Sequence, residues 1–255
     1  MEIGIKIGSA LLALEAKGKK TEAGLNPMAV MRLCLQLAEL NKEGHQLFLV
    51  TSGAVISDPK TDRPHNLRAS VGMARLISQY VQYLSFHGVE TAQMLFTDSD
   101  LHADCRNNLL DLINNALSCG VIPIINANDT VDWSELDRLA LCSDNDRLFM
   151  EICLGIKPDL AIIGFNRPAV LDEKGNFVRI VNAENYESLL TSCQSGGPHG
   201  HGRFGMATKM ESAKTLSLAG IVTMIVPGNT DGFIKSAIYE SKKRLLQFGT
   251  HFDFS

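Results

Sequence analysis

The sequence predicts an α/β fold built on a mostly parallel sheet, and two observations support this prediction. Short apolar segments alternate along the chain with longer segments whose apolar residues recur at helical spacing. Several of the short segments are apolar throughout, which is typical of parallel strands covered by helices on both faces. The alternation indicates right-handed βαβ units, and 255 residues suffice for a substantial buried core.

In the first half of the chain, predicted strands and helices alternate from the N-terminus onward. The first strand, 2–8, is apolar between Glu2 and Gly8 apart from Lys6. Asn26 and Pro27 are residue types that precede and begin helices, so we expect a helix over 28–43 that ends at Gly44. The segments that follow are predicted as a strand at 46–53, a helix at 67–87, a strand at 91–96, a helix at 103–120 and a strand at 121–126.

The second half continues the alternation and adds a hairpin around Lys174 and Gly175. No internal repeat or linker composition divides the chain, so we expect one domain, 1–255, with an N-terminal lobe of about 1–150 and a C-terminal lobe of about 151–255. The predicted elements are a helix at 144–155, a strand at 159–165, the hairpin at 168–181, a glycine-rich loop at 195–205, a helix at 205–219 and a strand at 221–228.

Composition narrows the class of protein. The formal net charge of −4 provides no broad basic surface for nucleic acid. The six cysteines show no CxxC spacing and several of them fall in apolar patterns, as expected of reduced thiols in a cytoplasmic protein. No apolar run approaches the roughly 20 residues that span a bilayer, so we expect no membrane association. His199 and His201 lack a third ligand nearby, and we predict no protein-built metal site.

Two lysines in unusual places indicate anion chemistry. Lys209 follows Gly205 at the start of a predicted helix, where free backbone N–H groups and the macrodipole attract anions. Lys6 interrupts a buried strand and needs an anionic partner, and Gly8 and Ser9 follow it directly. The alternatives are an ordinary surface lysine at 209 and a lysine at 6 that reaches solvent from an edge strand.

Polar residues cluster after several predicted strands, at the sheet edge where ligands of open α/β sheets bind. Asp129 could bind an α-ammonium group that Asn126 or Asn128 orients, although such residues are also common in turns. Asp144 can cap the next helix, which leaves Asp146 available to pair with both lysines. Phosphoryl transfer requires this neutralisation of charge, and the P-loop, HRD and DFG motifs are all absent.

The motifs KIGS, VTSGAV, ASVG, IPIINANDTV, DNDRL and GMATKMESA occur in an order that closely resembles the glutamate 5-kinases of the amino acid kinase superfamily. The terminal GTHF is similar to that family's GTLF. The resemblance implies a three-layer α/β/α sandwich with a central, mostly parallel sheet of about eight strands. It also implies transfer of the γ-phosphoryl group of ATP to the side-chain carboxylate of L-glutamate, with Mg²⁺ bound chiefly through the nucleotide. That reaction begins proline biosynthesis.

The same resemblance implies roles for individual residues and a homo-oligomer, either a dimer or a tetramer. The N-terminal lobe would bind glutamate and the C-terminal lobe the nucleotide, without the small RNA-binding-like domain found after the kinase domain in many relatives. The residues implied in catalysis are Lys6, Lys209 and Asp146. Those implied in glutamate binding are Ser52, Gly53, Asn126, Asp129 and Asn145. Those implied in ATP binding are Lys6, Gly8, Ser9, Gly164, Phe165, Arg203, Phe204, Gly205, Met206, Ala207, Thr208 and Lys209.

The chain departs from the family pattern mainly around the nucleotide. Phe165 replaces an expected aspartate, and Arg203 and Phe204 stand where small residues are usual. The NEND motif of the family is NAND in this chain. The interval before the DND triplet is about four residues longer than usual. Two alternatives stay open: another small-molecule kinase of the superfamily, and a non-catalytic sensor that binds an amino acid or a nucleotide. Retention of both lysines counts against the sensor.

Overall fold

The computed structural model describes residues 1–14, 24–101, 103–130, 144–167, 170–195 and 203–254. The chain divides into two compact units, residues 7–138 and residues 1–6 with 139–255. The main sheet has eight strands and is mostly parallel, with helices beside it in each unit, so the predicted α/β fold is confirmed. The assignment of glutamate and nucleotide to the predicted lobes stays a prediction.

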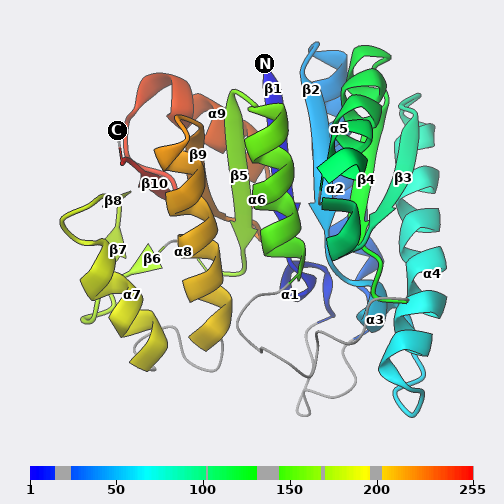
Figure 1. The fold of residues 1–255 in the computed structure, drawn as a ribbon, viewed down its shortest axis with the longest axis horizontal. Helices are drawn as coiled ribbons and strands as arrows, with labels where there is room; N and C mark the ends of the chain where they lie inside the picture. Colours follow the sequence, from blue (N-terminus) through cyan, green and yellow to red (C-terminus); the bar gives the residue numbers. More distant parts are fainter. Residues whose placement is uncertain (15–23, 102, 131–143, 168–169, 196–202, 255) are drawn as a thin grey trace. The chain divides into compact units, whose positions relative to one another are not determined.

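Within the unit 7–138, the strand order is β3 (Thr91–Phe96), β4 (Ile122–Ala127), β2 (Gln46–Thr51), and both pairings are parallel. In Figure 1, α5 (Ala103–Ser118) lies in front of β2 and β4, which it contacts. The helices α2 (Pro27–Lys42) and α4 (His65–Phe86) pack against each other. The short elements are α1 (Ser9–Leu12), α3 (Ala54–Ser57) and the 3₁₀ helix η1 (Asp98–Leu101).

Two local features explain the helices of this unit. The side-chain oxygen of Asn26 accepts hydrogen bonds from the backbone N–H groups of Met28 (3.1 Å) and Ala29 (3.4 Å), so the predicted cap of α2 is confirmed. A Cβ at Gly72 would lie 1.8 Å from the carbonyl oxygen of Ala54. The close packing of α3 on α4 therefore requires glycine at this position.

In the other unit, the strand order is β1 (Glu2–Ile7, in this unit to residue 6), β5 (Leu160–Phe165), β9 (Val222–Pro227), β10 (Thr250–Phe252), β8 (Ile180–Val181). Strands β5 and β9 are parallel, whereas β10 runs antiparallel to β9. In Figure 1, α6 (Asp144–Ile156) and α8 (Arg203–Leu218) lie in front of these strands. They pack on each other, and α9 (Phe233–Lys243) packs on β5 and β9.

Several elements depart from the sequence prediction. The predicted hairpin is present as β6 (Val170–Leu171) and β7 (Phe177–Val178), while residues 168–169 lie outside the described residues. The structure adds α7 (Tyr186–Ser195), which packs on α8, together with α9, β10 and the four-residue helices α1 and α3. The shortest of these span too few residues to show a hydrophobic period. Within the described part of the chain, none of the helices combines the length and hydropathy needed to cross a bilayer.

Candidate active site

Lys6 is buried inside the strand β1. Its neighbours Ile5 and Ile7 are fully buried, and Lys6 itself is only 1% exposed. Its ammonium group forms an ion pair with Oδ1 of Asp146, a residue 140 positions later in the chain. The alternative in which Lys6 reaches solvent from an edge strand is therefore wrong, because this ammonium is buried and paired.

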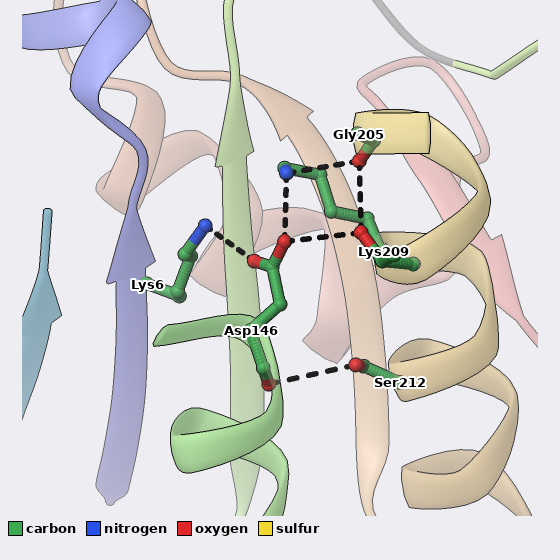
Figure 2. Close-up of polar contacts among 6 residues, drawn as sticks. Lys6, Asp146, Gly205, Lys209 and Ser212 are labelled. Carbon is green, nitrogen blue, oxygen red and sulfur yellow. Dashed lines mark hydrogen bonds and ion pairs between the residues drawn. The ribbon is translucent and has the colours of Figure 1, made fainter. Parts of the chain in front are cut away.

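Asp146 holds both lysines through its two carboxylate oxygens (Figure 2). It is the third residue of α6, and its side chain is 2% exposed. While Oδ1 faces Lys6, Oδ2 accepts a hydrogen bond of 2.9 Å from Nζ of Lys209. The hydroxyl of Thr208 lies 3.3 Å from the same oxygen, and that of Ser212 donates to the backbone carbonyl of Asp146 at 3.5 Å. The carboxylate is thus fixed from α8 as well as from β1.

Lys209 folds back along its own helix. Besides contacting Asp146, its ammonium donates to the carbonyl oxygen of Gly205 at 3.0 Å, one turn nearer the N-terminus of α8 (Figure 2). A Cβ at Gly205 would meet no atom of the described residues within 4 Å. The ammonium of Lys209 therefore lies at the positive end of the helix dipole, where backbone N–H groups have no partner within the helix.

The lysine–aspartate cluster, defined as Lys6, Asp146 and Lys209, carries two positive charges and one negative charge. Burial lowers the pKa of Lys6 to about 8, and the attraction of Asp146 opposes this shift. Burial alone would raise the pKa of Asp146, but Lys6 and Lys209 outweigh it and hold that pKa at about 2. At neutral pH the cluster is therefore a buried site with a net charge of +1, a state that an anionic ligand would stabilise.

Phe165 ends the strand β5, and its ring lies beside the cluster. The ammonium of Lys209 is 5.7 Å from the ring centroid, within the range of a cation–π interaction. The predicted nucleotide residue Gly164 precedes it in the same strand and is buried. The structure thus brings Phe165 to the same ammonium group as Asp146.

The predicted ATP-binding residues from 203 to 209 form the first turns of α8. Arg203 and Phe204 begin the helix, and Gly205 is half-buried. The side chains of Met206 and Ala207 are buried, so only the backbone of these two residues could contact a ligand. The glycine before Lys209 therefore lies within a helix that begins two residues earlier than the sequence predicts.

The other predicted binding residues, except Asn145, belong to the unit 7–138. Gly8 and exposed Ser9 form the start of α1, where the Gly8 carbonyl accepts from the N–H of Leu11 at 3.0 Å. The backbone N–H of Ser52 donates to the carbonyl of Ile7 at 2.9 Å. Gly53 caps α3 with a φ of +113°, a conformation that favours glycine.

Asn126 is the most deeply buried of these polar residues. It ends β4 with 2% exposure, and its Nδ2 contacts the sulfur of Met73 at 3.6 Å. Its Oδ1 has no hydrogen-bond partner among the described residues. Asp129 is half-buried in the turn after β4, and Asn145 is buried as the second residue of α6, in the unit that holds the cluster.

Metal ligands do not gather in the described part of the chain. No group of three or more histidine, cysteine, aspartate or glutamate residues is found there, and His199 and His201 lie outside the described residues. Both oxygens of Asp146 are engaged by ammonium groups. This carboxylate is therefore arranged to organise lysines.

Sequence reasoning missed three contacts of the cluster. The hydroxyl groups of Thr208 and Ser212 both contact Asp146, and the ring of Phe165 contacts Lys209. Thr208 and Ser212 are four residues apart, so they share one face of a helix. That spacing is the signal that could have identified the face of α8 turned toward α6.

Comparison with known proteins identifies the family of this chain. The sequence profile described as the amino acid kinase family matches residues 3–227. The chain belongs to the amino acid kinase family. Among curated relatives, the glutamate 5-kinase of Methylococcus capsulatus is 33% identical over 254 residues, covering 90% of this chain and 63% of that protein.

Two other relatives give a similar result. The glutamate 5-kinase of Acinetobacter baylyi is 33% identical over 246 residues, covering 90% of this chain and 62% of its own length. That of Shewanella oneidensis is 30% identical over 262 residues, with 97% and 66% covered. The predicted resemblance to this family is confirmed, and the chain spans slightly less than two thirds of the length of these relatives.

Proposed function

We propose that this protein is an ATP-dependent kinase that phosphorylates the side-chain carboxylate of L-glutamate to give L-glutamyl 5-phosphate, the first step of proline biosynthesis. The observation that carries the proposal is the buried cluster of Lys6, Asp146 and Lys209 with its net charge of +1. The relatives named as glutamate 5-kinases support the choice of glutamate. We also propose that the protein is a cytoplasmic homo-oligomer that uses no nucleic acid or membrane.

The proposed reaction requires charge neutralisation more than proton transfer. An oxygen of the glutamate side-chain carboxylate attacks the γ-phosphorus of ATP, and the bond from this phosphorus to the β,γ-bridging oxygen breaks. The electron pair of that bond leaves with ADP. No general base is needed because the attacking carboxylate is already ionised at neutral pH. The protein must align the two oxygens and stabilise the charge that moves between them.

The two ammonium groups can supply that stabilisation. Each ammonium has three N–H donors, and Lys209 uses two of them on Asp146 and on the carbonyl of Gly205. Lys6 uses one on Asp146, so among the contacts of the described residues both lysines have further donors for phosphoryl oxygens. The N–H groups in the first turn of α8, which have no partner within the helix, would hold the nucleotide phosphates beside Lys209. We assign catalysis to Lys6 and Lys209, and their positioning to Asp146.

The acceptor site is proposed from polar residues that follow the strands. Asp129 provides a carboxylate for the α-ammonium of glutamate, and the buried Oδ1 of Asn126 provides an acceptor. Ser52 and Gly53 of the same unit would complete this site, and Asn145 of the other unit is proposed as a further glutamate-binding residue. We propose that the N-terminal lobe binds glutamate and the C-terminal lobe binds the nucleotide.

Magnesium fits this arrangement as an ion held chiefly by the nucleotide. Asp146 is occupied by the lysines, and the described residues form no cluster of three ligands, so the phosphates of ATP would supply most of its coordination. When bound, Mg²⁺ would neutralise phosphate charge and would leave the lysines to act on the transferring group.

The test is ADP release by the purified chain with Mg²⁺, ATP and L-glutamate. We expect turnover that depends on glutamate and is not supported by N-acetyl-L-glutamate or UMP, the acceptors that mark related kinases. Lys209→Ala should lower kcat by roughly two to four powers of ten with a smaller change in KM, since the lost charge acts mainly in the transition state. Lys214→Ala is the matched control, because Lys214 lies on the same helix with its ammonium over the ring of Tyr186.

Three outcomes would contradict the proposal in different ways. Turnover with another acceptor only would assign the chain to a different small-molecule kinase. Binding of glutamate or ATP without any phosphoryl transfer would identify a sensor. An unchanged kcat in Lys209→Ala would show that the cluster does not take part in catalysis.

A further inference from the structure

Phe165 contacts the lysine–aspartate cluster without adding charge to it. Its ring centroid lies 5.7 Å from Nζ of Lys209, beside the ion pair to Asp146. Among the residues that the structure describes, Asp146 is the single carboxylate within ion-pair distance of Lys6 or Lys209. The cluster therefore has two cations, one anion and an aromatic wall.

The sheet fixes the position of this wall. Phe165 is the last residue of β5 and pairs in register with Pro227 of β9. Its carbonyl accepts a hydrogen bond of 2.8 Å from the N–H of Gly228, directly after β9. The ring is half-buried, so one part packs on the protein and another part is accessible. A ligand that reaches Lys209 on this side would meet an aromatic surface in a defined place.

An aromatic ring and a carboxylate would act on Lys209 in different ways. The face of the ring attracts an ammonium through its quadrupole but leaves the charge of the cation uncompensated. A carboxylate at the same strand end would cancel the second positive charge and bring the cluster to neutrality. The identity of residue 165 thus sets whether the site has a surplus charge to offer to an anion.

We infer that Phe165 is a specificity-determining residue that keeps the net charge of the cluster at +1, so that the phosphoryl donor is recognised mainly through its polyphosphate chain. The inference rests on the proposed function only in taking a nucleoside triphosphate as the donor. Phe165 thereby acts on binding of the donor through Lys209, with no part in the covalent step.

The experiment compares binding of sodium tripolyphosphate, ATP and adenosine by calorimetry in one buffer at pH 7. Wild type should bind tripolyphosphate within about tenfold of ATP, and adenosine at least about a hundredfold more weakly than ATP, because the surplus charge selects the polyphosphate. This comparison needs no variant. Adenosine binding as tight as that of ATP would overturn the inference.

Three substitutions then separate charge from shape. Phe165→Asp should weaken binding of tripolyphosphate by about 10–100-fold, because the added carboxylate removes the surplus charge. Phe165→Asn has nearly the same shape as Phe165→Asp without the charge, and Phe165→Leu keeps the apolar wall without the quadrupole. Both should weaken binding by no more than about fivefold. Thermal unfolding of each variant checks that the fold is kept.

The outcomes also separate this inference from the proposed function. Equal binding of tripolyphosphate by wild type and Phe165→Asp would overturn the inference, as would equal losses in Phe165→Asn and Phe165→Asp. If glutamate supports no ADP release while Phe165→Asp still loses tripolyphosphate, the proposed function fails and the inference stands. If glutamate turnover is present and the variants do not differ, the inference alone fails.

Discussion

The two units of the chain hold their polar residues in different ways. In the unit of residues 1–6 and 139–255, Lys6, Asp146 and Lys209 are joined into one buried network. In the unit 7–138, Asn126 ends a strand with a buried Oδ1 that has no partner among the described residues. One site thus has its charges paired in advance, and the other has an acceptor left open.

This difference matches two tasks of a phosphoryl-transfer enzyme. Cations that act on a moving charge must be held in place before the reaction, since reorganisation during the reaction would cost activation free energy. An acceptor that selects a substrate gains affinity when it is open beforehand, because no existing hydrogen bond has to be broken. The predictions below test whether the paired cluster and the open acceptor behave in these two ways.

The largest effect is expected from Asp146→Asn. The change keeps the shape of the side chain but leaves two buried ammonium groups without a counter-charge, so the free energy of unfolding should fall by about 3 kcal/mol or more. Urea unfolding at pH 7 measures the stability, and ADP release should show kcat lowered at least about a hundredfold.

Asp172→Asn is the matched control for this change, because Asp172 is a carboxylate in the turn of the β6–β7 hairpin of the same unit. It should leave kcat unchanged. A stable Asp146→Asn protein with full activity would mean that the lysines do not depend on their shared carboxylate.

The next largest effect is expected from the protonation of Lys6, which should make kcat depend on pH. Its pKa is lowered to about 8, so kcat should fall about tenfold per pH unit above that value as the ammonium loses its proton. In Lys6→Arg the guanidinium stays charged, and any residual activity should lose this alkaline limb. Persistence of the limb in Lys6→Arg would assign it to another group.

Stability should change in the opposite direction over the same range. The pKa of Lys6 is 10.5 in the unfolded chain and about 8 in the folded chain, so between these values the unfolded state binds more protons. The contribution of Lys6 to the free energy of unfolding therefore rises with pH in this window. The difference between wild type and Lys6→Met in urea titrations from pH 8 to 10.5 isolates that contribution.

Asn126→Leu tests the open acceptor with a smaller effect. The replacement removes a buried carbonyl group that has no hydrogen-bond partner in the described part of the chain, so stability should stay constant or rise by about 1 kcal/mol. KM for glutamate should rise about tenfold if Oδ1 accepts a hydrogen bond from the substrate. Asn114→Leu, at an exposed position of α5, is the control that should leave KM unchanged.

The sequence was sufficient for elements that carry their own pattern. The cap at Asn26 and the apolar strand around Lys6 predicted α2 and β1 from neighbouring residues alone. The strand β10 could not be predicted in this way, because it has three residues and depends on distant partners. Its Thr250 hydroxyl donates to the carbonyl of Val178 and accepts from the N–H of Val170, contacts that no local pattern encodes.

The site shows the same limit. Lys6 and Lys209 could be identified because a positive charge in a buried strand and one at a helix start each need an anion. Asp146 could be identified because a helix needs only one capping carboxylate and Asp144 can supply it. The contacts of Thr208 and Phe165 depend on how α8 is rotated and on where β5 ends. Such details follow from packing between elements, which single-chain periodicity does not determine.

The smallest effect is expected from Thr208→Val, which removes a hydroxyl 3.3 Å from Oδ2 of Asp146 and keeps the size of the side chain. The same hydroxyl lies 3.4 Å from the carbonyl of Gly205, so its single proton is shared between two long contacts. We expect kcat to fall by about two- to fivefold, the effect of one long hydrogen bond that is shared between two acceptors, and Thr208→Ser to restore it.

Stopped-time ADP assays with saturating substrates would resolve this difference between Thr208→Val and Thr208→Ser. If Thr208→Val lowered kcat as much as Asp146→Asn does, the account of how the cluster is held would be wrong. The carboxylate would then be positioned mainly by α8, and the two lysines would be held by a helix face instead of holding Asp146 between them.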